Sequence, residues 1–403
     1  MPKKICLISD HHLSINPRLW KEAFLYEKMG FEVYILTMWQ SDELLALDYE
    51  ILSGHNITYK PFLDMRPGAV SFLERFFYRL RKRAGVELQK RLKIGVPWAI
   101  SYAPERLLRL ALNEKADIYS AHLECGFIVG CKLIDLRKKV SFDFEDWYSR
   151  DYLTLDRPVS MLTKLEKFAL QNGAFCTAAS NSMARSLAMN YFVNKEIVTI
   201  YNSFPESLSN KKIDNYTNNP NVKKMLWTSR TAGPGRGIET LVAALSLLDF
   251  PIDLHIIGKC VEGYENLIKK SLASTKHKVI FHDFVKHSAL MESIQNFDIG
   301  LAIENNFPDN KNKTVSNKIL QYIQAGLLVL ATDTDGQAEV ATYFPESVFL
   351  VKPDSPEIWK IALIKIIASL DKHDRERQKR LFQEIFSWDS QEMKLKKLIN
   401  QYL

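Results

Sequence analysis

The chain has 403 residues and a formal net charge of +7, and this length exceeds the size at which one hydrophobic core keeps growing, which predicts two domains. With 46% hydrophobic and 25% charged residues, the composition is typical of a soluble globular protein. No apolar stretch approaches ~20 residues, which argues against a membrane span. The polar N-terminus argues against a secretory signal. The five cysteines are scattered and never form a C-x-x-C pair, which argues against a zinc site or a disulfide framework and favours a reducing, cytoplasmic compartment.

The first half of the chain alternates short apolar runs with helical patterns. A helix is predicted from Pro17, a residue that suits the first helical turn, to a stop at Gly30. Strands that end in polar residues are predicted at 4–9, 31–37, 117–122, 139–146, 175–180 and 197–202. Such alternation predicts a doubly wound parallel sheet.

A strongly basic segment interrupts this pattern. Between residues 66 and 93 there are nine Arg or Lys and two Glu. Aromatic residues are interleaved with the cations, namely Phe72, Phe76, Phe77, Tyr78 and Trp98. One interpretation is a helix that meets an anionic membrane surface or an anionic acceptor, with the patch formed by Arg75, Arg79, Arg81, Lys82 and Arg83. The other is an amphipathic surface helix whose aromatics face the core while the cations are solvated.

The second half begins after a polar stretch at 206–221, which we predict to be a linker. The strand pattern then restarts with VKKMLWTSR, followed by strands at 252–258, 278–283, 298–304 and 327–331. Helices are predicted at 238–248, at 288–296, and from an N-cap at Ser316 to a stop at Gly326. The chain therefore predicts two similar α/β domains, residues 1–205 and 206–386, that face each other across a cleft.

The loop predicted at 229–237 carries the most distinctive chemistry. It has three glycines, two arginines six positions apart (Arg230 and Arg236), and a helix start directly after it. The arginine fork matches phosphate geometry, and a helix N-terminus favours an anion, so this loop predicts a phosphate site. The alternative is a turn that merely closes a βα unit. The loop is neither a Walker A motif nor G-x-G-x-x-G.

Taken in order, TSR, GPGRGIETLVAAL, LHIIG, SNKILQYIQAG and LATDTDGQAEV resemble the nucleotide-sugar domain of GT-B-fold glycosyltransferases, in particular glycosyltransferase family 4. SDHHLSINPRLWKEA, DIYSAHLE and FDFEDWY in the first half also resemble this family. The resemblance implies two Rossmann-like domains, with the segment 387–403 as a helix that crosses back onto the first domain. It implies retaining transfer of a sugar from a nucleotide-diphosphate donor to a glycan or lipid-linked acceptor, as in cell-surface polysaccharide synthesis. No cofactor, obligatory metal or nucleic acid is implied.

The resemblance also implies roles for single residues. Arg230 and Arg236 would hold the donor diphosphate and neutralise it as it leaves. His122 would lie near the reacting sugar, although a lone histidine at a strand end is more often structural. The remaining donor-side candidates are Gly235, Gly237, Glu304, Ser316, Asn317, Lys318, Gln321, Asp335 and Gly336. The acceptor-side candidates are Asp10, His11, His12 and Arg18, which provide acceptor contacts or structure and no metal site.

One position departs from the family pattern. Lys313 and Gln321 stand where the family usually has two glutamates. Gln321 can still bond a ribose diol, but Lys313 cannot replace a carboxylate. Either the loop at 305–314 is remodelled so that Glu304 approaches the site, or sugar selection differs. The departure leaves two further functions open: a nucleotide-sugar epimerase or hydrolase, and a catalytically degenerate scaffold that binds a nucleotide sugar.

Overall fold

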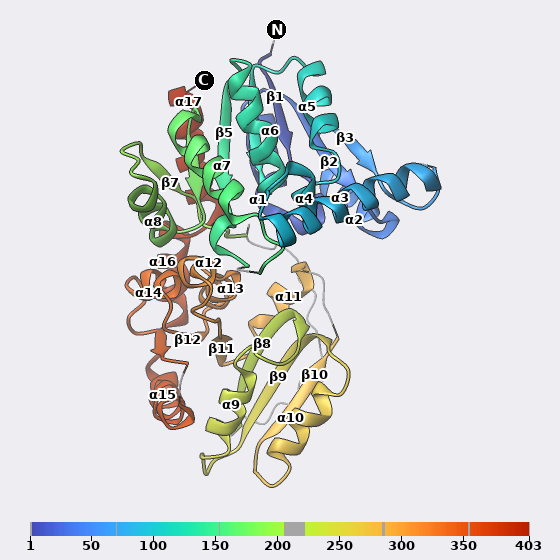
Figure 1. The fold of residues 1–403 in the computed structure, drawn as a ribbon. Helices are drawn as coiled ribbons and strands as arrows, with labels where there is room; N and C mark the ends of the chain where they lie inside the picture. The colour runs from blue at the N-terminus through green and yellow to red at the C-terminus, as the bar shows by residue number, and fades with distance from the viewer. Residues whose placement is uncertain are drawn as a thin grey trace. The chain divides into compact units, whose positions relative to one another are not determined.

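The structure is a computed structural model that describes residues 2–69, 71–152, 154–204, 222–283, 287–353 and 355–402. The linker predicted at 206–221 lies outside these residues. The chain divides into two compact units (Figure 1). Unit 1 comprises Met1–Ile200, Pro308–Asn310 and Lys394–Leu403, and unit 2 comprises Tyr201–Phe307 and Lys311–Met393.

Unit 1 is built on a parallel sheet with the strand order β3-β2-β1-β4-β5-β6-β7. Its strands are β1 (Lys4–Ile8), β2 (Glu32–Trp39), β3 (Ile57–Asp64), β4 (Ile118–His122), β5 (Val140–Phe144), β6 (Cys176–Ala178) and β7 (Ile197–Thr199). Every residue of β4 and β5 is buried, which shows that both faces of the sheet are covered. The helices are α1 (Pro17–Lys28), α2 (Asp42–Leu52), α3 (Phe72–Leu92), α4 (Pro97–Ile100), α5 (Pro104–Asn113), α6 (Leu123–Asp135), α7 (Val159–Asn172) and α8 (Asn181–Tyr191), with 3-10 turns η1 (Leu13–Ile15) and η2 (Tyr148–Arg150).

Unit 2 repeats this plan with the order β10-β9-β8-β11-β12-β13, again parallel. Its strands are β8 (Lys223–Ala232), β9 (Ile252–Cys260), β10 (Lys278–His282), β11 (Ile299–Ala302), β12 (Leu328–Thr332) and β13 (Val348–Val351). Its helices are α9 (Ile238–Leu245), α10 (Tyr264–Leu272), α11 (His287–Ile294), α12 (Asp309–Lys313), α13 (Asn317–Gln324), α14 (Asp335–Ala341), α15 (Pro356–Ser369), η3 (Leu370–Lys372) and α16 (Arg375–Ile385). The predicted pair of doubly wound parallel sheets is confirmed.

The last helix, α17 (Trp388–Tyr402), starts in unit 2 and ends in unit 1. Within unit 1, the Lys139 ammonium donates to the carbonyl of Tyr402 at 2.8 Å. The ring of Tyr402 lies 5.9 Å from that of Phe175, measured between centroids. The C-terminal turn of the chain is therefore an integral part of the first unit.

In both sheets the strand order reverses direction once. The reversal lies between β1 and β4 in unit 1 and between β8 and β11 in unit 2. In open parallel sheets, ligands bind at the carboxyl ends of the strands at such a switch point. The topology therefore predicts a ligand site at the carboxyl edge of each sheet.

The ends of α13 form as the sequence predicts. The Ser316 hydroxyl caps the helix by accepting from the N–H of Lys318 at 3.3 Å. Gly326 has φ +80° and closes it, a conformation that glycine adopts without a steric cost. The helix buries Ile319, Leu320 and Ile323. It then leads into β12, whose residues are all buried.

The loop predicted to begin at Ser229 starts later, so that boundary was wrong. Strand β8 continues to Ala232, and its register with β9 skips two residues between Thr228 and Thr231. This bulge is possible because Gly258 stands opposite, where a Cβ would lie 2.2 Å from the carbonyl oxygen of Ser229. The bulge places Arg230 at the exposed end of the strand.

Among the described residues, no helix is long and apolar enough to cross a membrane.

Candidate functional site

Two arginines lie at the switch-point edge of unit 2. Arg230 on the β8 bulge and Arg236 in the loop before α9 are both exposed. Arg236 Nη1 donates to the Ser229 hydroxyl at 2.9 Å. Within the described part of the chain, Arg230 has no hydrogen bond or ion pair. The edge therefore offers guanidinium donors to an anion from solvent.

The glycines of this loop let it pack directly on β11. Gly237 precedes α9 with φ +78°, and a Cβ there would lie 2.4 Å from Cγ2 of Ile303. The Asn305 side chain donates to the carbonyl of Gly235 at 3.3 Å. The loop, the N-terminus of α9 and the end of β11 thus meet at one place, as expected for a switch-point site.

The carboxylate of Glu304 follows β11 and lies at the start of α13. Its Oε1 accepts from the Ser316 hydroxyl at 2.8 Å and pairs with Lys318 Nζ at 2.5 Å. Burial alone would raise the pKa of Glu304, but Lys318 and Ser316 outweigh it and hold the pKa below its ordinary value. Glu304 is therefore ionised at neutral pH. The predicted donor residue Asn317 lies in sequence between Ser316 and Lys318, the two partners of Glu304. An anion at this place is stabilised by the helix dipole.

Shortly before α13, Lys313 has an acidic partner. The Lys313 ammonium pairs with the Asp335 carboxylate at the start of α14. Gly336 makes this approach possible, because a Cβ there would lie 2.2 Å from the carbonyl oxygen of Thr314. Gln321 is buried within α13. Glu304 thus supplies a carboxylate at this edge, and its role toward the donor sugar stays a prediction.

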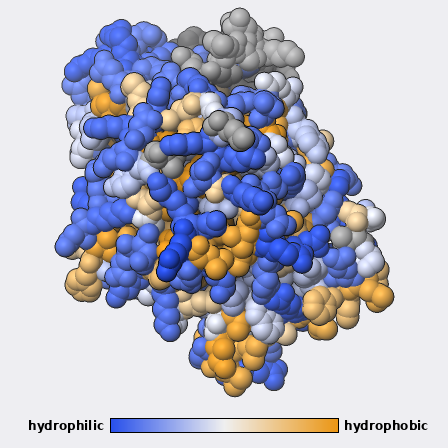
Figure 2. All heavy atoms as spheres, turned by 90° about the horizontal axis from the view of Figure 1, so that it is seen from above, coloured by the Kyte–Doolittle hydropathy of each residue, from blue (hydrophilic) through white to orange (hydrophobic). Residues whose placement is uncertain are grey.

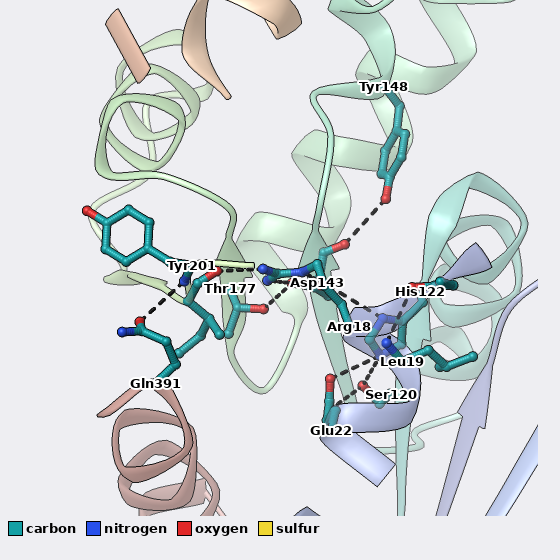
Figure 3. A network of polar contacts seen from close by, with 12 residues as sticks. Arg18, Leu19, Glu22, Ser120, His122, Asp143, Tyr148, Thr177, Tyr201 and Gln391 are labelled. Atoms are coloured by element: carbon teal, nitrogen blue, oxygen red, sulfur yellow. Dashed lines mark hydrogen bonds and ion pairs between the residues drawn. The ribbon is translucent and has the colours of Figure 1, made fainter. Parts of the chain in front are cut away.

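In unit 1, two predicted residues, Arg18 and His122, belong to one buried polar network (Figure 3). The Arg18 guanidinium binds both oxygens of Asp143, at 2.7 and 2.5 Å, and donates to the carbonyl of Ile200 at 2.5 Å. His122 Nε2 lies 3.0 Å from Glu22, and its Nδ1 lies 3.5 Å from Asp143. Ser120 and Thr177 add hydrogen bonds to the carboxylates of Glu22 and Asp143, at 2.7 and 2.6 Å.

The charges of this network are matched. Burial alone would lower the pKa of His122, but Glu22 and Asp143 raise it to about 9. The Arg18 guanidinium and His122 hold the pKa of Asp143 well below its usual range against the effect of burial. Since the side chain of His122 is only 1% exposed, the geometry favours a structural role for Arg18 and His122 as found here. The contact between His122 and a reacting sugar stays a prediction.

His12 is held in the same structural way. Its Nε2 accepts from the backbone N–H of Gln40 at 2.8 Å, so the ring proton is on Nδ1, which donates to Asp48 at 2.5 Å. The residue is fully buried. Of the two interpretations, acceptor contact or structure, the geometry favours structure.

Asp10 and His11 do lie at the carboxyl edge of β1. The His11 side chain is half exposed, and its Nδ1 lies 3.1 Å from Asp10 Oδ1. The hydrogen bond with Asp10 raises the pKa of His11, and the charges of Glu145 and Glu124 raise it further. His11 therefore carries positive charge at this edge more readily than a free histidine does.

Glu124 and Glu145 are two acidic residues that the sequence analysis did not assign. Burial raises the pKa of each to about 7. Glu124, in the first turn of α6, pairs with Arg157. Glu145 follows β5 directly, and among the described residues it makes no hydrogen bond or ion pair. Their positions in the sequence could have pointed to them. Asp10, Glu124 and Glu145 each follow the end of a strand, and these three strands are neighbours in the sheet. A carboxyl group that titrates near neutral pH at a ligand edge is a candidate functional group.

No group of three or more His, Cys, Asp or Glu in the described ranges could hold a metal ion.

Comparison with known proteins places this geometry in context. Residues 222–369 match the family model described as Glycosyl transferases group 1. Comparison with curated proteins finds no match. A glycosyltransferase structure from Rickettsia africae is 15% identical with a TM-score of 0.67, covering 100% of this chain and 98% of that one. Anabaena HepE (Alr3699) in complex with UDP is 12% identical with a TM-score of 0.68, covering 99% and 100%. An α,α-trehalose-phosphate synthase (UDP-forming) from Burkholderia vietnamiensis is 10% identical with a TM-score of 0.67, covering 100% and 97%. At such identities these similarities establish the shared fold.

Proposed function

We propose that this chain, whose residues 222–369 match a glycosyl transferases group 1 domain, transfers a sugar from a nucleotide-diphosphate sugar to a glycan or lipid-linked acceptor. The observation that carries the proposal is the pair Arg230 and Arg236 at the switch-point edge of unit 2. Two of the similar structures support it, since one contains UDP and the other is named as forming UDP.

The proposed chemistry needs only this chain's own residues and the two substrates. The bond between the anomeric carbon and the diphosphate oxygen breaks, and the leaving diphosphate gains negative charge. Arg230 and Arg236 neutralise that charge, and the N-terminus of α9 adds the helix dipole. The acceptor oxygen bonds to the anomeric carbon on the same face, which retains the configuration, and its proton passes to the leaving diphosphate. No cofactor or metal enters this proposal.

Unit 1 would bind the acceptor at the carboxyl ends of β1, β4 and β5. Asp10, His11 and Glu145 are the groups at this edge that could hydrogen-bond to sugar hydroxyls. We place the protein in the cytoplasm, peripheral to the inner face of the membrane, in the synthesis of a cell-surface polysaccharide. The basic helix α3 supports the membrane part of this proposal.

Glu145→Gln is expected to flatten the pH dependence of kcat/KM near neutrality. The pKa of Glu145 is raised to about 7, so its charge changes within the working range, and glutamine keeps the shape without the titration. Profiles of the wild type and the variant between pH 5.5 and 8.5 provide the measurement. Glu384→Gln, an acidic residue on α16, is the control and should leave the profile unchanged. Identical profiles for wild type and Glu145→Gln would exclude this role.

Nucleotide binding tests the proposed function directly. Thermal shifts are measured with UDP, GDP, ADP, CMP and dTDP and the matching sugar nucleotides, on the wild type and on Arg230→Ala. One nucleotide diphosphate at about 100 times its Kd should stabilise the wild type by about 2.7 kcal/mol, and the variant should lose most of this effect.

The anomeric configuration of the product, read by NMR, tests retention. Sugar released or epimerised without any acceptor would favour the epimerase or hydrolase, and binding without turnover would favour the scaffold.

A further inference from the structure

Helix α3 presents a large apolar face to solvent. The exposed large apolar residues in its N-terminal half are Phe72 (73%), Leu73 (75%), Phe76 (54%), Phe77 (58%) and Leu80 (53%). At 100° per residue these five lie on one side of the helix, opposite Tyr78, Gly85 and Gln89, which are turned toward the protein. Apolar side chains form patches on the hydrophilic surface in the space-filling view (Figure 2). The interpretation in which the aromatics of this helix face the core is therefore wrong for Phe72, Phe76 and Phe77.

Contacts on the other side of α3 hold the helix in this orientation. A Cβ at Gly85 would lie 2.8 Å from the backbone nitrogen of Ala99, so α3 packs against α4 without space between them. Arg81 donates to Glu105 at 2.5 Å, and its guanidinium lies 5.3 Å from the ring centroid of Trp98. Lys82 Nζ lies 4.5 Å from the ring centroid of Tyr102. The apolar face cannot turn inward without breaking these contacts.

The charge of α3 indicates what covers this face. Within Phe72–Leu92 there are seven Arg or Lys and two Glu. Arg81 and Lys82 are engaged with the protein, whereas Arg79 and Arg83 are exposed and lie beside the apolar stripe. Large apolar side chains flanked by cations match the acyl boundary and the anionic headgroups of a bilayer surface.

The C-terminal end of α3 lies near the candidate acceptor edge of unit 1. The helix begins shortly after the carboxyl end of β3. Just beyond its end, a Cβ at Gly95 would lie 3.2 Å from Cβ of Pro158. The neighbouring Arg157 pairs with Glu124 in the first turn of α6. The C-terminal end of α3 is therefore connected through these contacts to Glu124, whose charge acts on His11 at the candidate acceptor edge.

We propose that α3 docks unit 1 onto an anionic lipid bilayer by inserting Phe72, Leu73, Phe76, Phe77 and Leu80, with Arg79 and Arg83 at the headgroups, and that the acceptor is lipid-linked. The lipid-linked acceptor rests on the proposed function, whereas the docking of α3 onto the bilayer does not. Docking confines the protein to the plane in which such an acceptor diffuses. It thereby raises the local concentration of the acceptor at the edge of β1, β4 and β5.

Vesicle sedimentation tests the docking. The full chain is mixed with vesicles of phosphatidylglycerol and phosphatidylcholine, and with phosphatidylcholine alone. The triple variant Phe72→Ser, Phe76→Ser and Phe77→Ser should lose at least tenfold in partitioning to the anionic vesicles. The matched control, Met189→Ser with Phe192→Asn, removes apolar residues that are 76% and 89% exposed near the end of α8, and it should bind like the wild type.

The charge contribution is separable. Arg79→Gln and Arg83→Gln should each weaken binding about fivefold at physiological salt and reduce its salt dependence. Equal partitioning of the wild type and the triple variant would overturn the docking proposal. So would wild-type self-association that the triple variant abolishes without any binding to vesicles, because α3 would then be an interface between copies of this chain.

The acceptor class is tested with a pair of glycosides that carry the same sugar. Transfer to a hexadecyl glycoside in anionic vesicles should exceed transfer to the methyl glycoside at least tenfold. The triple variant should lose this advantage and keep the rate with the methyl glycoside. Equal rates on both glycosides would overturn the lipid-linked acceptor. Vesicle binding without turnover of either glycoside or hydrolysis of any donor would instead contradict the proposed function and leave docking intact.

Discussion

Arg236→Ala is expected to lower the rate of sugar transfer by about 10²- to 10³-fold and to leave the fold unchanged. Arg236 is exposed, and the one hydrogen bond that it makes among the described residues is to the Ser229 hydroxyl. Its removal therefore costs little stability. The loss falls on the transition state, where the diphosphate gains charge. Arg230→Ala should behave in the same way, since Arg230 stands on the same edge.

The measurement is kcat/KM at saturating acceptor, together with the thermal unfolding midpoint of each variant. Arg380→Ala, which removes an exposed arginine on α16, is the control and should retain full activity. Arg236→Lys keeps the charge but loses the planar fork, so it should retain an intermediate rate. If Arg230→Ala and Arg236→Ala both transfer sugar at the wild-type rate, the assignment of the diphosphate site is wrong.

Asp143→Ala is expected to destabilise the protein by about 3–5 kcal/mol, because it leaves two buried cations without their shared partner. Arg18 makes two hydrogen bonds to Asp143, and His122 Nδ1 lies 3.5 Å from it. Urea unfolding at pH 6 gives the free energy directly. Asp371→Asn, at an exposed position in η3, should change it by less than about 0.5 kcal/mol.

The pH dependence of stability follows from His122. Its pKa in the folded protein is raised to about 9, above an unfolded value of about 6.5. The folded state therefore binds more protons between these values. The stabilisation is fully present below about pH 6.5 and is lost as the pH rises through 9. His122→Gln should remove this component. A variant that loses stability between pH 6.5 and 9 as steeply as the wild type would show that His122 is not its source.

Elements with local signals were predictable from sequence. Ser316 and Gly326 mark the ends of α13 through capping and backbone conformation, which depend on neighbours in the chain. Strand β3 gave no such signal and was not predicted. It lies at the edge of the sheet, contains Pro61, and is only partly buried. An edge strand lacks the continuous apolar run that reveals a central one.

In the candidate site, too, local features were predictable from sequence and long-range contacts were not. The spacing of Arg230 and Arg236 is local, and so was readable from sequence. The environment of His122 depends on Glu22 and Asp143, and Arg18 meets Asp143 across 125 positions of the chain. Spacing discloses neither these partners nor the depth at which Glu145 lies. The partner of Lys313, Asp335, likewise comes from another loop. Long-range pairing of this kind is set by the fold.

The chain passes from unit 1 to unit 2 for the first time at the peptide group between Ile200 and Tyr201. Its carbonyl accepts from Arg18 at 2.5 Å, and its N–H donates to Gln391 Oε1 on α17 at 3.3 Å (Figure 3). The peptide plane cannot rotate unless both bonds break together. The amide proton of Tyr201 is therefore a built-in probe. Its exchange with deuterium reports how often the hydrogen bond to Gln391 opens, and Gln391→Ala should accelerate that exchange without touching either sheet.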